Sequence, residues 1–207
     1  QYEQALFNFK DFTNRSPKTG AMYVDGLVRL ADCHYVSKVY PDALSTYNRA
    51  RQLNSPDDDY ILFQTGVING ILRNYADARN QFTVLISSYP KSQYRDEAFF
   101  QRAQFEIEQG NYEVAANGLT QLINEGAGSR FLPYAYLRRA ASYFNLKQYD
   151  RTVNDYAAIL QKFPTHPLAQ QVLLPLQEAL GLAGRGGEFE NYLAQFKKAN
   201  PESKNLE

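Results

Sequence analysis

The segment Tyr112-Glu113-Val114-Ala115 is one of four copies of a short pattern that decides the fold. The other copies are Tyr40-Pro41-Asp42-Ala43, Tyr75-Ala76-Asp77-Ala78 and Tyr149-Asp150-Arg151-Thr152. The successive tyrosines lie 35, 37 and 37 residues apart. Periods of this length are typical of chains built from stacked helical units.

Residue size repeats in the same register as the tyrosines. A small residue lies twelve positions before the fourth residue of each copy, and a large one lies four positions after it. The small residues are Ala31, Gly66, Ala103 and Ala140, and the large ones are Tyr47, Phe82, Leu119 and Tyr156. Small residues let two antiparallel helices approach to about 8–10 Å, and apolar residues recur at the helical spacing of three and four. We therefore predict an all-α fold, an α-α superhelix of antiparallel hairpins with about 11 helices and no strand.

The expected organisation is a single array over residues 1–207. A second helix without a first helix occupies 1–17, and hairpins follow at 20–54, 58–88, 93–124, 131–162 and 167–199. The last hairpin fits the pattern least well. Its small position holds Gln177, and Pro175 lies inside the expected first helix over 167–183, which it should kink because proline cannot donate a backbone hydrogen bond.

Both ends of the chain resemble interrupted repeats. Tyr2, Ala5 and Phe9 match the positions of a second helix, and Asn200–Lys204 resembles the junction Tyr89–Gln93 that opens another repeat. Because each repeat buries its face only against its neighbours, we expect a fragment of a longer array. The alternative is that a partner or a second copy of the chain covers the apolar N-terminal edge.

These features resemble the tetratricopeptide repeat. Leu27, Leu62, Phe99 and Tyr136 stand where that family's consensus has Trp, and the period is slightly longer than usual. The resemblance implies a helical solenoid that binds proteins. The junction Tyr89-Pro90-Lys91-Ser92 also resembles the Tol-Pal-associated and outer-membrane-assembly repeat proteins of Gram-negative bacteria. That resemblance implies a periplasmic or outer-membrane-associated location, with a cytoplasmic location as the alternative.

Composition argues against several classes of function. Lys and Arg number 22, as do Asp and Glu, so the net charge is zero, whereas nucleic-acid binding needs a basic field. No stretch approaches the roughly 20 apolar residues of a membrane-spanning helix.

No group of residues indicates catalysis, a metal or a cofactor. Cys33 and His34 are adjacent on a helix and therefore point in different directions. His166 falls in a loop between repeats, the glycines of Gly181–Glu188 follow a helix rather than a strand, and Asp57–Asp59 suits a helix start. We interpret all of these as structural and predict a protein that is not an enzyme.

The family resemblance implies that a groove along the first helices binds the partner. At these positions the chain presents mainly apolar and aromatic residues: Tyr60, Phe63, Val67, Phe100, Gln104, Tyr134, Leu137 and Phe144. Aromatic side chains bury a large area with few rotamers to restrict. The hypothesis is that an amphipathic helix or an extended apolar segment docks near Phe63, Phe100 and Tyr134. The alternative is that these rings pack between neighbouring first helices.

Taken together, the sequence predicts a scaffold for protein–protein interaction, with a protein or peptide as its partner. The alternative is a structural segment of a larger bacterial envelope protein that self-associates through its incomplete repeat ends.

Overall fold

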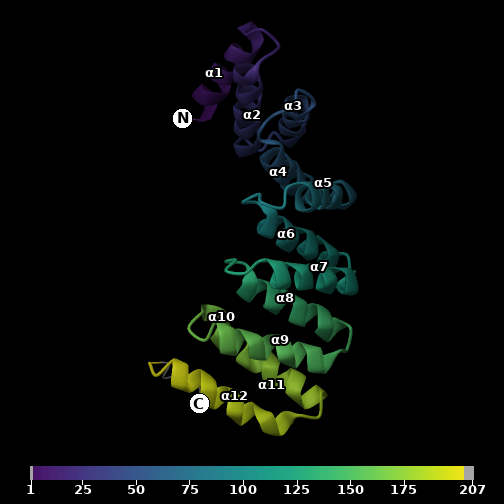
Figure 1. The fold of residues 1–207 in the computed structure, drawn as a ribbon, viewed down its shortest axis with the longest axis vertical. Helices are drawn as coiled ribbons and strands as arrows, with labels where there is room; N and C mark the ends of the chain where they lie inside the picture. Colours follow the sequence, from purple (N-terminus) through teal and green to yellow (C-terminus); the bar gives the residue numbers. More distant parts are fainter. Residues whose placement is uncertain (1, 203–207) are drawn as a thin grey trace. The chain divides into compact units, whose positions relative to one another are not determined.

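The computed structural model describes residues 2–202, and across these residues it contains twelve α-helices, one short 3-10 helix and no strand (Figure 1). This confirms the predicted all-α class. The second helices are α1 (Tyr2–Arg15), α3 (Tyr40–Gln52), α5 (Tyr75–Ser88), α7 (Tyr112–Glu125), α9 (Tyr149–Lys162) and α12 (Phe189–Ala199). The first helices are α2 (Ala21–Val36), α4 (Asp58–Ile71), α6 (Arg95–Glu108), α8 (Leu132–Asn145) and the pair α10 (Pro167–Gln171) and α11 (Leu173–Leu182). The 3-10 helix η1 (Gly186–Glu188) lies between α11 and α12.

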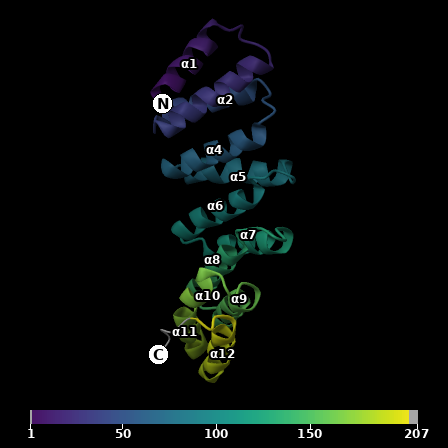
Figure 2. The same ribbon diagram turned by 90° about the vertical axis from the view of Figure 1, so that its left-hand side faces the viewer.

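The chain divides into two compact units, residues 1–98 and 99–207, and each is described by itself. In the first unit α1 packs on α2, α2 on α3 and α4 on α5. In the second unit α7 packs on α8, α8 on α9 and α9 on α11, as both views show (Figures 1 and 2). The expectation of one array over residues 1–207 stays a prediction.

The turn inside each hairpin has one repeated geometry. In the fourth hairpin Lys147 has φ 58°, its N–H donates to the Phe144 carbonyl (2.9 Å), and the Gln148 N–H donates to the Tyr143 carbonyl (2.8 Å). This pair of bonds is the Schellman motif, which ends a helix with one left-handed residue. The left-handed residues of the five turns are Lys38, Arg73, Gly110, Lys147 and Gly184. The last hairpin, whose sequence pattern is weak, therefore shares the turn of the others.

The repeated small and large residues form the cores of the hairpins. Ala31 and Tyr47 of the first unit and Ala140 of the second unit are fully buried. The fourth residue of each copy of the turn pattern is also fully buried, namely Ala43, Ala78, Ala115 and Thr152. Gly66 shows why a small residue is needed, because a Cβ placed there would lie 2.7 Å from Cε1 of the Phe82 ring. The predicted pairing of a small residue on the first helix with a large one on the second is confirmed at this hairpin.

The expected first helix at 167–183 is interrupted. Helix α10 ends at Gln171 and α11 begins at Leu173, so the break lies just before Pro175. Proline has no N–H to donate to the carbonyl four residues earlier, and its ring crowds that carbonyl, which here belongs to Gln171. Gln177, at the predicted small position, is exposed, and Leu176 is buried instead.

The two ends of the described chain differ in their packing. In α1, Thr13 is buried against α2, whereas Phe7 is 66% exposed. After α12, the Asn200 side-chain amide donates to the Pro164 carbonyl (2.9 Å). The expected repeat junction continues to Ser203 and Lys204, which lie outside the described residues.

Candidate protein-binding surface

In the first unit, the predicted groove residues pack against neighbouring helices. Phe63 is only 8% exposed, and its ring centroid lies 6.0 Å from that of Phe82 and 5.3 Å from that of Tyr94. The Tyr60 ring contacts Tyr47 edge-on at 6.3 Å and Tyr94 at 5.5 Å. In this unit, therefore, the rings of Tyr60 and Phe63 pack against aromatic rings of neighbouring elements, as the alternative interpretation expected. Val67 is partly buried on the same helix.

A single carboxylate organises this aromatic group. The hydroxyls of Tyr47 and Tyr60 both donate to Oδ1 of Asp32, at 2.5 and 2.8 Å, and Arg29 Nη1 lies 3.4 Å from its Oδ2. Burial, together with the carboxylate that accepts the hydroxyl proton, raises the pKa of Tyr60 to about 12. The same causes raise the pKa of Tyr47 further. The arrangement ties α4 to α2 and α3, because Asp32 lies on α2 and Tyr47 on α3.

In the second unit, the aromatic side chains form a ladder that reaches solvent. The Phe100 ring stacks on Phe131 at 5.7 Å and meets the Tyr134 ring edge-on at 6.4 Å. Tyr134 then meets the His166 ring edge-on at 5.5 Å. Tyr134 is 42% exposed. The ladder therefore runs from α6 over the start of α8 to the residue that precedes α10.

The remaining predicted residues have different surroundings. Leu137 packs against the core of the second unit. Phe144 lies at the hairpin turn, where its ring contacts Tyr149 edge-on at 5.6 Å. Gln104 Nε2 donates to Glu108 (3.1 Å), while its Oε1 is buried without a hydrogen-bond partner among the described residues. Of the predicted residues in this unit, the structure brings Phe100 and Tyr134 into direct contact.

The residues considered for chemistry have structural roles in the described chain. Cys33 is buried, and burial raises the pKa of its thiol. His166 caps α10, because its Nδ1 accepts from the Leu168 N–H (3.2 Å). Asp57 precedes α4, and Asp58 pairs with Arg51 at 2.7 Å. Within residues 2–202 no cluster of three or more His, Cys, Asp or Glu suits a metal, and no helix has the length and apolarity to span a membrane.

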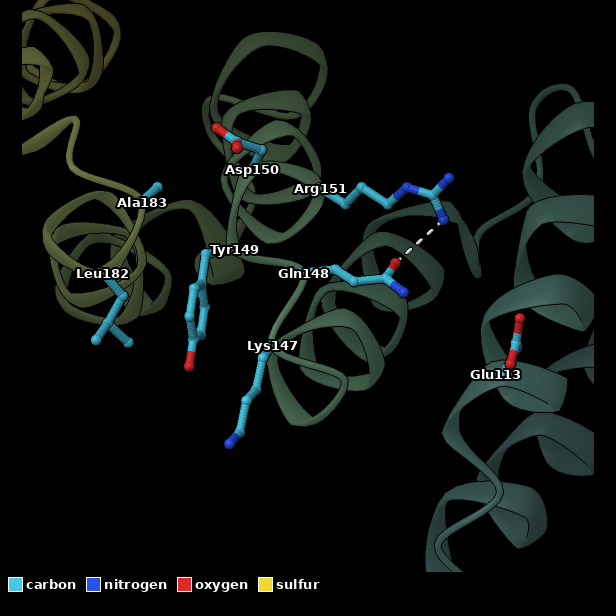
Figure 3. Close-up of a pocket in the computed structure, with 8 residues that line it drawn as sticks. All are labelled: Glu113, Lys147, Gln148, Tyr149, Asp150, Arg151, Leu182 and Ala183. Atoms are coloured by element: carbon cyan, nitrogen blue, oxygen red, sulfur yellow. Dashed lines mark hydrogen bonds between the residues drawn. The ribbon is translucent and has the colours of Figure 1, made fainter.

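A depression of about 710 Å³ lies at the hairpin turns of the second unit (Figure 3). It is bordered by Glu113, by the turn Lys147–Arg151 and by Leu182 and Ala183. Arg151 donates to Gln148 at 3.1 Å, as Figure 3 shows, and Asp150 pairs with Arg185 at 3.1 Å. Because it is open and is bordered by side chains of both charges, the depression favours no class of ligand.

Helical periodicity gives no indication of a second kind of feature, namely the crevices between a first helix and two second helices. In the first unit such a crevice is lined by Lys10, His34 and Arg49, among others. These residues come from three different helices, and the pattern of helical periodicity does not show which polar side chains face one another. Comparing equivalent positions between hairpins is the signal that finds them.

Comparison with known proteins agrees with this geometry. The family model described as tetratricopeptide repeat matches residues 134–166, which span α8, α9 and the loop that follows. No curated protein sequence matches the chain.

Solved structures match over most of the chain at low identity. The crystal structure of MamA has a TM-score of 0.67 at 13% identity, covering 89% of this chain and 95% of that one. YrrB, titled a TPR protein with an unusual peptide-binding site, has a TM-score of 0.64 at 13% identity, with 94% and 92% covered. PilF of Pseudomonas aeruginosa has a TM-score of 0.63 at 17% identity, with 98% and 86% covered. Residues 134–166 therefore match a tetratricopeptide repeat, and the chain shares its fold with solved structures that include TPR proteins.

Proposed function

We propose that the chain is a protein-interaction scaffold without catalytic activity, and that an apolar segment of its partner docks on the first-helix face around Phe100 and Tyr134. The observation that carries this proposal is the 42% exposure of Tyr134 within the aromatic ladder, between Phe100 and His166. Its ring is held between Phe100 and His166, so little side-chain freedom is lost on binding. Aromatic side chains presented in this way are typical anchors of protein interfaces.

The packing found in the first unit narrows the proposed surface. Phe63 is enclosed by Phe82 and Tyr94, and the Tyr60 hydroxyl is bonded to Asp32. Replacing either residue would disturb the fold as well as any interface. Tyr134 is the better residue to test, because its exposed part can be changed while the core stays intact.

The test is site-specific photo-crosslinking followed by affinity measurement. A photoreactive phenylalanine analogue at Tyr134 should capture a partner in the native cell, and mass spectrometry then identifies the crosslinked segment. Val114, 57% exposed on the second helix α7, is the matched control position. A synthetic peptide of the captured segment should lose affinity by about tenfold or more in Tyr134→Ala and remain unchanged in Val114→Ala. Equal binding by both variants, or crosslinking confined to position 114, would contradict the proposal.

A second candidate function, self-assembly within a larger envelope protein, is favoured by the exposed apolar side chains of α1. Phe7 is 66% exposed and Phe12 is 36% exposed. Light scattering of the wild type and of Phe7→Glu tests it, since a dimer that dissociates in the variant supports self-association. A wild type that is monomeric at high concentration would exclude it.

The periplasmic location implied by the Tyr89–Ser92 junction stays a prediction.

A further inference from the structure

A buried ion pair lies in the crevice between α7, α8 and α9, beside a cavity of about 390 Å³ that both of its residues line. Arg139 of α8 donates to both carboxylate oxygens of Asp155 on α9, at 2.9 and 2.6 Å, and to Thr120 of α7 at 2.8 Å. The side chains of Arg139 and Asp155 are 14% and 5% exposed. The α7–α8–α9 crevice is therefore a polar site whose cation and anion are both supplied by the chain itself.

The crevice between α1, α2 and α3 is the equivalent place in the first unit. Counted from the turn tyrosines Tyr40 and Tyr149, Leu30 holds the position of Arg139, and Thr46 holds that of Asp155. The ion pair is thus missing from the α1–α2–α3 crevice. A cavity of about 290 Å³ lies there, and Leu30 and Thr46 are both among its lining residues.

Basic groups line this cavity in place of the ion pair. Lys10 reaches it from α1, His34 from α2 and Arg49 from α3. Among the described residues neither Lys10 nor Arg49 has a carboxylate within ion-pair distance, although Arg49 lies over the Tyr23 ring at 5.4 Å.

His34 adds an independent sign of a missing partner. Its Nδ1 is buried and has no hydrogen-bond partner among the residues described. Buried polar atoms in folded proteins are almost always paired, and an unpaired one destabilises the fold. His34 also lines the cavity, so a half-turn of its imidazole ring would bring this nitrogen to a ligand oxygen.

We propose that the α1–α2–α3 crevice binds a carboxylate group carried by a protein partner. A carboxylate oxygen accepts hydrogen bonds from guanidinium, ammonium and imidazole groups, which are the groups presented by Arg49, Lys10 and His34. The volume lies at the small end for ligand sites, so it suits one acidic side chain or a chain terminus rather than a large molecule. Asp42 also lines the cavity, so two cations face one anion there and the balance favours a single negative charge.

This site is separate from the aromatic surface proposed above, because it lies in the other unit and is lined largely by the second helices α1 and α3. The two proposals fail independently. Loss of peptide binding on Tyr134→Ala says nothing about the crevice, and loss of carboxylate binding on Arg49→Gln says nothing about the aromatic ladder.

The test is NMR titration of the full 15N-labelled chain with small probes. Acetyl-glutamate methylamide should shift the backbone amides of Thr46 and Arg49 and the imidazole nitrogens of His34, whereas the matched acetyl-glutamine methylamide should not. Acetyl-alanine with a free terminus, compared with its amide, distinguishes a terminal carboxylate from a side-chain one. Inorganic phosphate is a further probe, of a different anion. No shift with either carboxylate, equal shifts with the neutral probes, or a response to phosphate alone would each overturn the proposal.

Variants assign the response to the crevice. Lys10→Gln and Arg49→Gln should each lower the affinity for the carboxylate probe by about tenfold, since each removes one charged hydrogen-bond donor. Lys91→Gln removes an exposed lysine elsewhere in the same unit and should leave binding unchanged. Unaltered affinity in Lys10→Gln and Arg49→Gln would place the probe elsewhere and refute the assignment.

A transplant from the second unit gives a sharper result. The double change Leu30→Arg and Thr46→Asp should rebuild the Arg139–Asp155 pair inside the α1–α2–α3 crevice and abolish binding of the probe. Far-UV circular dichroism checks that this variant folds. If it does not, the Lys10→Gln and Arg49→Gln affinities decide the matter alone. Full binding by a folded transplant would contradict the proposal.

Discussion

The Arg139–Asp155 pair supports a prediction that can be worked out from its burial. Arg139→Met leaves the Asp155 carboxylate, 5% exposed, without its charged partner. Uncompensated buried charges of this kind destabilise a protein by about 3–5 kcal/mol. The cation–π contacts of Arg139 with Tyr136 and Tyr143, at 5.6 and 5.8 Å, add about 0.5–1 kcal/mol each. We therefore expect Arg139→Met to lower the free energy of unfolding by about 5 kcal/mol.

Replacing Asp155 instead of Arg139 should lower the free energy of unfolding by less. In Asp155→Leu the guanidinium of Arg139 keeps its hydrogen bond to Thr120 and is 14% exposed, so water reaches it more readily. A loss of about 2 kcal/mol is expected. The double variant, with Met and Leu in the same crevice, should lie within about 1 kcal/mol of the wild type, because apolar side chains of similar volume replace a buried pair with little change in stability.

The assay is a double-mutant cycle of urea unfolding, followed by far-UV circular dichroism. If the pair acts as a unit, the stability losses of the two single variants add up to more than the loss of the double variant. The difference is the coupling energy, expected to be several kcal/mol. A double variant as unstable as the sum of its singles would refute the reasoning. It would mean that packing of the long side chains, rather than pairing of the charges, stabilises the crevice.

The pH dependence of Arg139→Met is an additional check. Burial raises the pKa of Asp155, and Arg139 opposes that rise. Without Arg139 the folded-state pKa of Asp155 rises further, so the folded state takes up a proton more readily than the unfolded state. A raised carboxyl pKa contributes stability at low pH that is lost as the pH rises through it. The deficit of Arg139→Met relative to the wild type should thus be smaller at about pH 5 than at about pH 8.

Three further predictions concern single positions. Gly66→Ala should lower the free energy of unfolding by about 1–3 kcal/mol, because the added methyl lies 2.7 Å from the Phe82 ring. Gly118→Ala should instead raise it by about 0.5–1 kcal/mol in the same urea assay, because the nearest atom is a nitrogen of the flexible Arg102 side chain at 3.5 Å. Lys147→Gly should stabilise the chain by about 0.5–1 kcal/mol, because φ is 58° there, and an unchanged or lower melting temperature would contradict this. The pKa of Tyr60 is raised to about 12, so its hydroxyl contributes stability that is fully present below about pH 10 and is lost as the pH rises toward 12. Tyr60→Phe, which lacks the bond to Asp32, should show a smaller loss of stability between about pH 10 and pH 12.

The sequence by itself determined the helices and their pairing. Four second helices begin at the repeated tyrosines Tyr40, Tyr75, Tyr112 and Tyr149, and the small positions are buried where the pattern requires it. This succeeds because helical periodicity and residue size act locally, between residues a few positions apart or within one hairpin. The break before Pro175 was foreseen as a kink for the same reason, since proline disrupts the turn that precedes it.

The tertiary structure decided what each polar or aromatic side chain does. Phe63 and Tyr134 were equivalent candidates in the sequence, yet one is 8% exposed and the other 42%. Likewise the sequence does not reveal that Arg139 pairs with Asp155, whereas Lys10 and Arg49 line a cavity with no carboxylate within ion-pair distance of them among residues 2–202. Burial and charge pairing depend on side chains contributed by neighbouring hairpins. Candidate residues that the sequence alone does not distinguish therefore differ in exposure and charge pairing according to the residues packed against them.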